Sequence, residues 1–136
     1  MAGTLKLEIV TPEGTTYSED VEMVTLPGSE GELGIYPKHV PVLTTLKPGE
    51  LRIVKGGRES TMAIGEGFVE IKGDAVSVLT DMALESEKID IATAEAAVER
   101  AKAAMKEDHT AEEVAAIQAS LQKALAQLQV KRRRHG

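Results

Sequence analysis

The spacing of apolar residues changes near residue 89, and this change limits the folds that the chain can adopt. Before it, apolar and polar residues alternate in short runs, as in "TLKLEIV" at residues 4–10, which is typical of β-strands with one buried face. After it, apolar residues recur every three or four positions, which is typical of amphipathic helices. The sequence therefore predicts a β-domain of residues 1–86 and a helical domain of residues 87–136.

Short alternating runs follow one another through the first part, and turn signals separate them. The pairs Gly56-Gly57 and Gly73-Asp74 supply residues that tolerate the positive φ of tight hairpins. Many short strands with such turns are typical of an antiparallel β-sandwich or flattened barrel. The expected fold class is therefore α+β, with an N-terminal antiparallel β-sandwich (flattened barrel) followed by a C-terminal α-helical hairpin.

Two helices are expected in the second part, at about residues 90–106 and 111–132. Asp90 is a candidate N-cap for the first, and Thr110 with Glu113 has the spacing of a capping box for the second. The short connection between them requires an antiparallel pair. The expected apolar stripes are Ala94, Ala97, Val98, Ala101 and Met105 in the first helix and Val114, Ile117, Leu121, Leu125 and Leu128 in the second.

Alanine forms most of the expected contact surface of the first helix. Each buried methyl or methylene contributes about 0.8 kcal/mol, so an alanine surface gains less from docking than a leucine surface. The high helix propensity of alanine lets each helix persist when undocked. Two interpretations stay open: an ordinary close-packed hairpin, and a hairpin that is held weakly enough to move.

Charge and composition argue against several classes of function. Residues 1–88 carry 8 basic and 15 acidic side chains, a balance of −7, while the remainder of the chain carries +1. An acidic body with only two tyrosines and one phenylalanine does not suit nucleic-acid binding. No apolar run approaches the roughly 20 residues that cross a bilayer, so no direct insertion into the bilayer is expected.

No arrangement of residues indicates catalysis. His39, His109 and His135 stand far apart, and the chain has no cysteine, so no metal site is expected. The loop of residues 28–50 is rich in glycine and proline and holds a tyrosine and a lysine beside His39. No helical pattern follows its glycines, and no acidic partner lies near by sequence. We expect neither a cofactor nor an enzymatic activity.

One segment carries a specific resemblance. "GSEGELGIYPKHVPVLTTLKPGELRIV", at residues 28–54, closely resembles the hallmark segment of the epsilon subunit of bacterial F-type ATP synthase, of the form G-S-E-G-E-L-G-I-Y-P-x-H-x-P-L-L-T. The opening "LKLEIVTPEG" and the alanine-rich hairpin agree in order, so the resemblance covers essentially the whole chain. It implies a non-catalytic rotor subunit of the central stalk, which couples proton translocation through the c-ring to ATP synthesis in the catalytic head.

The resemblance also implies partners and contact residues. The β-domain would bind the gamma subunit and the c-ring, and the hairpin would bind alpha and beta subunits transiently and inhibit ATP hydrolysis. The location would be peripheral, on the cytoplasmic face of an energy-coupling membrane, expected to be a bacterial plasma membrane. By position, the expected c-ring contacts are Glu30, Gly31, Glu32 and His39, the expected gamma contact is Thr44, and the cations expected to contact the catalytic head are Arg100, Lys123, Lys131, Arg132, Arg133 and Arg134.

Three alternatives stay open beside these expectations. The basic run at residues 131–134 also fits a solubilising tail whose cations suit a helix C-terminus. Some members of the family bind ATP through a segment I-D-x-x-R-A, which here reads "IDIATA", so Asp90 and Arg100 are candidates for a nucleotide site that lacks its guanidinium at Thr93; weak or no binding is expected. A free-standing protein-binding adaptor module is the alternative function.

Overall fold

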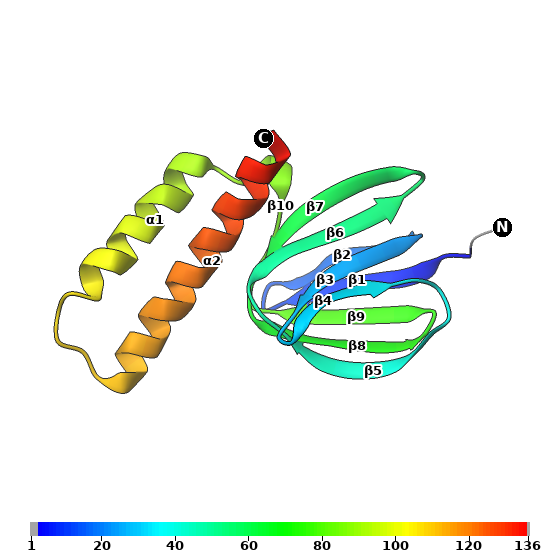
Figure 1. The fold of residues 1–136 in the computed structure, drawn as a ribbon, viewed down its shortest axis with the longest axis horizontal. Coiled ribbons are helices and arrows are strands. Elements are labelled where there is room, and N and C mark those ends of the chain that lie inside the picture. The colour runs from blue at the N-terminus through cyan, green and yellow to red at the C-terminus, as the bar shows by residue number, and fades with distance from the viewer. Residues whose placement is uncertain (1–2, 136) are drawn as a thin grey trace.

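The computed structural model describes residues 3–135, except for the side chains at positions 39, 40, 134 and 135. Strands form the first part, and two helices stand at one end of it, with α2 (Ala111–His135) between α1 (Ile91–Ala104) and the strands (Figure 1). This arrangement confirms the predicted fold class, a β-sandwich followed by an α-helical hairpin.

Ten strands in the described residues form one sheet. They are β1 (Leu5–Thr11), β2 (Gly14–Val21), β3 (Met23–Gly28), β4 (Gly31–Ile35), β5 (His39–Leu46), β6 (Gly49–Lys55), β7 (Arg58–Ile64), β8 (Gly67–Gly73), β9 (Ala75–Thr80) and β10 (Ala83–Glu85). Neighbours follow the order β10-β7-β6-β3-β5-β8-β9-β1-β2, and β4 pairs with β3 outside this path. The β1–β9 pair is parallel, which an all-antiparallel sandwich does not predict, because β1 enters between β9 and β2 from a distant point in the chain.

The core of the sandwich follows from the alternation. In β1, Leu5, Leu7 and Ile9 are fully buried, while Lys6 between them is exposed. The same period in the other strands gathers one cluster of large aliphatic side chains, which contains no residue of α1 or α2. The sandwich therefore has a hydrophobic core of its own, independent of the hairpin.

Two of the predicted tight turns are confirmed. Gly56 and Gly57 have φ values of 60° and 74° and join β6 to β7, where Lys55 pairs with Arg58. These are the left-handed conformations that a two-residue hairpin needs, and glycine adopts them without steric cost. Gly73, with φ 56°, begins the two-residue turn between β8 and β9.

Both predicted helix caps are confirmed. The carboxylate of Asp90 accepts hydrogen bonds from the backbone N–H of Ala92, at 3.0 Å, and from the hydroxyl of Thr93, at 3.0 Å. At α2, the N–H of Thr110 donates to the Glu113 carboxylate at 2.8 Å and the N–H of Glu113 donates to the Thr110 hydroxyl at 3.1 Å, the reciprocal bonds of a capping box. A short 3-10 helix, η1 (Ser86–Lys88), links the sandwich to α1.

Acid should loosen both helix starts. Hydrogen bonds from Thr93 hold the pKa of Asp90 below its usual value, and bonds from Thr110 do the same for the pKa of Glu113. Capping stability is therefore complete above the unfolded-state pKa values, at about pH 4, and is lost as pH falls through the lower folded-state values. Amide hydrogen exchange in the first turns of α1 and α2 should measure the opening.

Asp90→Asn is the matched control for this pH response, because asparagine keeps an N-cap acceptor that does not titrate. It should abolish the acid-induced opening of α1 and leave that of α2 unchanged. Equal acid responses of α1 in the native chain and in Asp90→Asn would contradict the assignment of the response to this carboxylate.

The two helices meet through small side chains, as expected from the alanine content. Ala94 and Val98 of α1 pack with Ala124 and Leu128 of α2, and Ile91, Ala97 and Leu121 lie around them. Alanine thus lines the contact on both helices, which keeps the gain from docking small.

The predicted burial is wrong for two residues of the apolar stripes. Met105 follows the last residue of α1 and is 37% exposed, and Leu125 is 40% exposed. Met105 is exposed because it caps the end of α1, and Leu125 because α2 buries two other sides, one against α1 and one against β6 and β7. Val130 lies on the side of α2 that faces the strands, where it is fully buried with Ala63 and Ile89.

Candidate partner-binding surfaces

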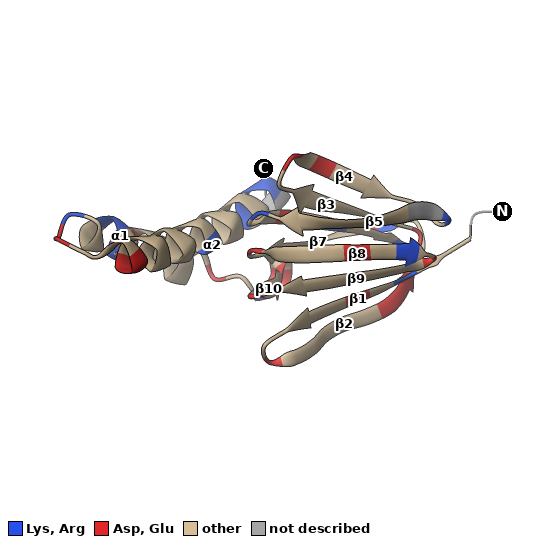
Figure 2. Cartoon of the chain, turned by 90° about the horizontal axis from the view of Figure 1, so that it is seen from below, with Lys and Arg blue, Asp and Glu red and all other residues tan. Residues whose placement is uncertain are grey.

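The β3–β4 turn presents a group of acidic residues at one edge of the sandwich (Figure 2). Glu30 lies at its exposed tip, and Glu32 is exposed on β4. A Cβ on Gly28 would lie 2.6 Å from the backbone oxygen of Gly31, so the tight closure of this turn requires a residue without a side chain. Gly31 itself has φ 132°. The glycines of the resemblance segment therefore hold two carboxylates in a defined position.

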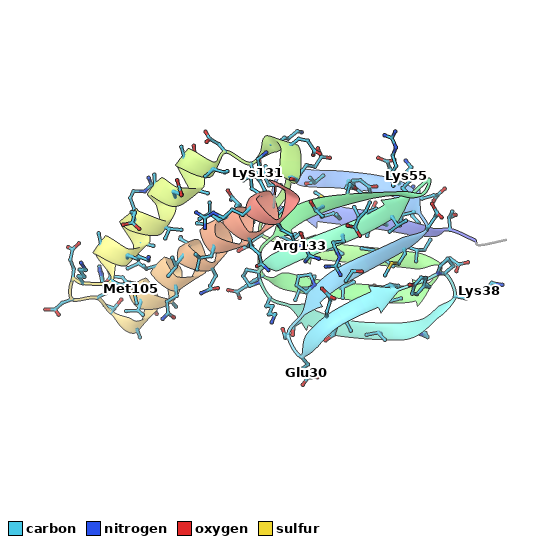
Figure 3. The ribbon with its side chains drawn as sticks, turned by 45° about the horizontal axis from the view of Figure 1, so that its top comes forward. Glu30, Lys38, Lys55, Met105, Lys131 and Arg133 are labelled. Atoms are coloured by element: carbon cyan, nitrogen blue, oxygen red, sulfur yellow. The ribbon has the colours of Figure 1, made fainter. Side chains whose placement is uncertain are left out.

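The four predicted ring contacts do not lie together. Glu30, Gly31 and Glu32 share the β3–β4 turn and the start of β4, whereas His39 begins β5, beyond the other end of β4. Figure 3 shows Glu30 and Lys38, the neighbour of His39, at well-separated corners of the sandwich. The five residues of β4 alone span about 17 Å at the usual rise per residue. The side chain of His39 lies outside those that the structure describes.

Lys38 forms part of a separate feature at that far end. It has φ 66°, unusual for a residue with a side chain, and its N–H donates to the carboxylate of Asp74 at 2.7 Å. This bond supplies the acidic partner that the sequence around Lys38 did not reveal. Asp74 accepts this bond from the backbone N–H of Lys38 and not from a side chain. The contact therefore stabilises a turn and does not assemble a catalytic group.

An exposed apolar patch lies on the outer face of β5, β8 and β9. Leu43, Phe68 and Leu79 are 69%, 44% and 39% exposed, and Phe68 pairs with Leu79 across the strands. The predicted gamma contact, Thr44, is half-buried and pairs with the buried Val69, on the opposite face of β5 from Leu43. Sequence reasoning missed this β5–β8–β9 patch, although consecutive apolar residues at Val78 and Leu79 were a signal that both faces are apolar.

Most of the predicted head-contacting cations are held against other parts of this chain. Lys123 pairs with Asp81 at 3.0 Å, Lys131 donates to the backbone oxygen of Ser86 at 3.0 Å, and Arg132 pairs with Glu95 at 2.9 Å. Arg133 pairs with Glu50, and Arg100 is exposed on α1. The side chain of Arg134 lies outside those described.

The alternative of a frayed solubilising tail does not fit this geometry. α2 continues as a helix to His135, beyond the expected end at 132. Lys131 contacts η1, and Arg133 contacts β6 of the sandwich. Figure 2 shows basic residues, in blue, at this end of α2, next to the strands. The described cations are therefore contacts of a docked helix.

A pocket of about 370 Å³ separates part of α2 from the sandwich beside this contact. It is lined by Pro27, Glu32, Lys47, Glu50, Gln129 and Arg133, among others. Two carboxylates and two cations thus face one polar space between the domains. Sequence reasoning missed this group, because its members come from positions far apart in the chain.

The two candidate nucleotide-binding residues are also apart. Asp90 is engaged by the first turn of α1, including the hydroxyl of Thr93, the residue in the place of the family's arginine. Arg100 follows ten residues later, about 15 Å along the helix axis at the standard rise. It lines a small alanine-rich groove between the helices, with Ile117. Weak or no nucleotide binding stays a prediction.

The described residues form neither a metal-binding group nor a membrane-spanning helix. No group of three or more histidine, cysteine, aspartate or glutamate residues is arranged to hold a metal ion among the side chains that the structure describes, which exclude those of His39 and His135. Within residues 3–135, no helix is long and apolar enough to cross a membrane.

Comparison with protein families matches nearly the whole chain in two consecutive pieces. Residues 4–86 match the β-sandwich domain of the ATP synthase delta/epsilon chain, and residues 87–132 match its long α-helix domain. The fold and these matches define an ATP synthase subunit of the delta/epsilon class.

Comparison with individual relatives narrows this class to the epsilon chain. The chain is 44% identical over 134 residues to the ATP synthase epsilon chain of Dehalococcoides mccartyi (strain BAV1), with 96% of each chain covered. It is 42% identical over 127 residues to the ATP synthase epsilon chain of Laribacter hongkongensis, with 92% and 91% covered. The chain therefore belongs to the ATP synthase epsilon chain family, as its resemblance segment predicted, and is a non-catalytic accessory subunit. The alternative of a free-standing adaptor is set aside.

Solved structures with the same fold come from mitochondrial ATP synthases. A chain in the Euglena gracilis enzyme, solved with its OSCP, F1 and c-ring parts, superposes with a TM-score of 0.78 at 24% identity, covering 93% of this chain and 79% of that one. A chain in the central stalk and c-ring of the Tetrahymena thermophila enzyme gives 0.68 at 14% identity, covering 96% and 98%. At these identities the likeness shows the shared fold.

Proposed function

We propose that this chain is the central-stalk subunit that joins the gamma subunit to the c-ring of a proton-translocating ATP synthase. The observation that carries the proposal is the match of both domains, in order, to ATP synthase epsilon chains over 134 residues. The related fold in a structure described as central stalk and c-ring supports it. We place the subunit peripherally, on the cytoplasmic face of a bacterial plasma membrane.

The β3–β4 turn is our candidate for the ring-facing surface. Glu30 and Glu32 are exposed there on a backbone braced by glycines at 28 and 31. Carboxylates on a rigid turn suit basic or polar loops of a ring, since charge complementarity sets register and specificity. His39, beyond the far end of β4, stays a candidate contact apart from this turn, because β4 separates its backbone from that of Glu30.

The β5–β8–β9 patch is our candidate for the gamma-facing surface. Three exposed apolar side chains, Leu43, Phe68 and Leu79, lie close together on one sheet face. Apolar side chains of this size, surrounded by polar ones such as Glu70, are typical of the centre of a protein interface. Thr44 stays a candidate gamma contact outside this patch, because its side chain lies on the opposite face of β5.

The hairpin is our candidate for the regulatory element. Its docking on the sandwich rests on a small cluster of Val130 with Ala63 and Ile89, on the Arg133–Glu50 pair, and on a Lys123–Asp81 pair that bulk water can replace. Undocking would release Lys123, Lys131 and Arg133 for acidic surfaces of alpha and beta subunits, while Arg100 is exposed already. An extended hairpin of this charge would block rotation during ATP hydrolysis.

Reversing the charge of Glu32 tests the ring assignment. We expect Glu32→Lys to weaken binding to the c-ring about tenfold or more, because placing like charges across an interface costs several kcal/mol. ATP-driven proton pumping of membranes carrying the variant should fall relative to their ATP hydrolysis, with the isolated chain still folded by circular dichroism.

Glu59→Lys is the matched control, since Glu59 is exposed on β7 away from the β3–β4 turn. It makes the same charge change and should leave pumping unchanged. Pumping by Glu32→Lys membranes equal to that of the control would overturn the assignment of Glu32.

A further inference from the structure

Four charged side chains form a continuous row from the end of α2 to the ring-facing surface. Arg133 Nη1 lies 2.8 Å from Glu50 Oε1, and Arg52 Nη1 lies 3.3 Å from the same oxygen. The other nitrogen of Arg52, Nη2, lies 3.2 Å from Glu32 Oε1. We call these four residues the four-charge cluster. Figure 3 shows Arg133 where the end of α2 meets the strands.

The members of the four-charge cluster differ in solvent exposure, and this difference decides which of them an external partner can reach. The side chain of Glu50 is 6% exposed and that of Arg52 is 18% exposed, whereas Glu32 is 59% exposed. A buried carboxylate needs a cationic partner at all times, because an unpaired buried charge is costly. Glu50 can take that partner from Arg52, from Arg133 or from both, while Glu32 is open to an external partner.

The charges of the cluster change when the hairpin leaves. With α2 docked, two arginines and two glutamates sum to zero. Without Arg133, the remaining three sum to −1, and Arg52 is the member of the cluster that contacts both carboxylates. Docking of Arg133 is therefore favoured by the negative charge that Arg52 leaves uncompensated.

We propose that Arg52 couples docking of the C-terminal hairpin to engagement of Glu32 by a basic partner surface. A cation that binds Glu32 from outside neutralises one carboxylate of the cluster, so Arg52 and Glu50 compensate each other and the attraction for Arg133 weakens. Linkage makes the effect reciprocal, so hairpin release strengthens binding of a basic surface at Glu32. The identity of that surface as the c-ring rests on the proposed function; the coupling within the chain does not.

Thiol labelling measures the docking equilibrium in the full-length chain. The chain has no cysteine, so Val130→Cys places a single thiol where α2 is fully buried against the sandwich. Its labelling rate, relative to that of the unfolded chain, gives the ratio of undocked to docked hairpin even when the undocked state is rare. A separate Val78→Cys chain, with its thiol in the sandwich core, reports unfolding of the sandwich.

The charge balance of the cluster predicts whether each neutralising substitution raises or lowers the ratio of undocked to docked hairpin in the Val130→Cys chain. Glu32→Gln and Glu50→Gln should raise the undocked ratio about three- to fivefold, the size of a partly exposed ion pair. Arg52→Gln should lower it by a similar factor, because Arg133 then docks onto two uncompensated carboxylates. Glu32→Gln combined with Arg52→Gln restores the native charge balance and should return the ratio to within about twofold of the native value.

A purely structural role of Arg52 predicts different results. If Arg52 only braced the sandwich, Arg52→Gln would raise the undocked ratio, the double variant would raise it further, and Val78→Cys labelling would rise with both. Either of the first two results overturns the proposal. Glu30→Gln and Arg132→Gln are matched controls, since Glu30 is next to the cluster but outside it and Arg132 pairs with Glu95 within the hairpin; neither should change the ratio.

Purified c-ring separates this proposal from the proposed function. Added c-ring should raise the undocked ratio of the Val130→Cys chain and leave that of its Glu32→Gln derivative unchanged. A ring that binds the chain without changing the native ratio overturns the coupling to the partner. A ring that does not bind at all overturns the proposed function, while the four labelling ratios of the isolated chain still decide the role of Arg52.

Discussion

ATP synthase assembled with residues 1–88 of this chain should hydrolyse ATP several times faster than the enzyme assembled with the whole chain. The truncation removes α1 and α2, the only part of the chain that we propose to enter the catalytic head. The sandwich should stay folded without them, because its main cluster of buried side chains draws on strands alone. Proton pumping driven by ATP should therefore be retained.

A shorter truncation tests whether inhibition depends on the basic end of α2 or on the helices as a whole. Deleting residues 131–136 removes Lys131 and Arg133, which tether α2 to the sandwich, and the neighbouring Arg132. If these cations contact the head, hydrolysis should rise towards that of the 1–88 enzyme. If they act only as tethers, hydrolysis should fall below that of the whole chain, because the hairpin undocks more often. An unchanged hydrolysis rate with 1–88 would contradict the regulatory role of the hairpin altogether.

Gly67→Ala should destabilise the sandwich by about 3 kcal/mol or more, the upper end of the cost of overpacking a core. A Cβ at this position would lie 1.8 Å from the backbone oxygen of Leu79 and 2.8 Å from the Cα of Thr80. Both neighbours are backbone atoms of β9, so relief requires the β8–β9 pairing to separate. Denaturation by urea, followed by circular dichroism, measures the loss.

Gly34→Ala is the control for this substitution. Gly34 also lies in a strand, but the nearest atom to its Cβ would be the flexible end of Met23, at an ordinary 3.5 Å. Its stability should change by less than about 1 kcal/mol, as at most surface positions. Equal losses in the two variants would show that glycine content in strands matters here, and that close approach of β8 to β9 does not.

Local patterns were sufficient for the elements and the turns. Alternation in β1 predicted which of Leu5, Lys6 and Leu7 are buried, and the spacing of Thr110 and Glu113 predicted a capping box that the structure contains. These features depend on residues within a few positions of one another, where backbone geometry allows few arrangements. The most specific part of the family resemblance was as local, a segment of 27 residues at positions 28–54, although the resemblance extends over the chain.

Features that depend on distant residues were missed or placed wrongly. The exposed Leu125 looked like a stripe residue because its period fits α1, but α2 also packs on β6 and β7, which shifts burial towards Val130. The separation of His39 from Glu30, both predicted contacts of the c-ring, was also not evident from the sequence. Nine positions apart in the sequence, they lie at different ends of a strand.

The sequence alone determined the order of a β-sandwich and a helical hairpin, the caps and turns within them, and membership of the epsilon chain family. Only the tertiary structure decided which charges meet. Arg133 is 83 positions from Glu50, and nothing in the spacing of either residue selects the other. Packing of α2 on the sandwich brings them together, because burial of Val130 fixes where the end of that helix lies. Because of that contact, the basic run at the end of α2 is interpreted as a link between the hairpin and Glu32, and not as a solubilising tail.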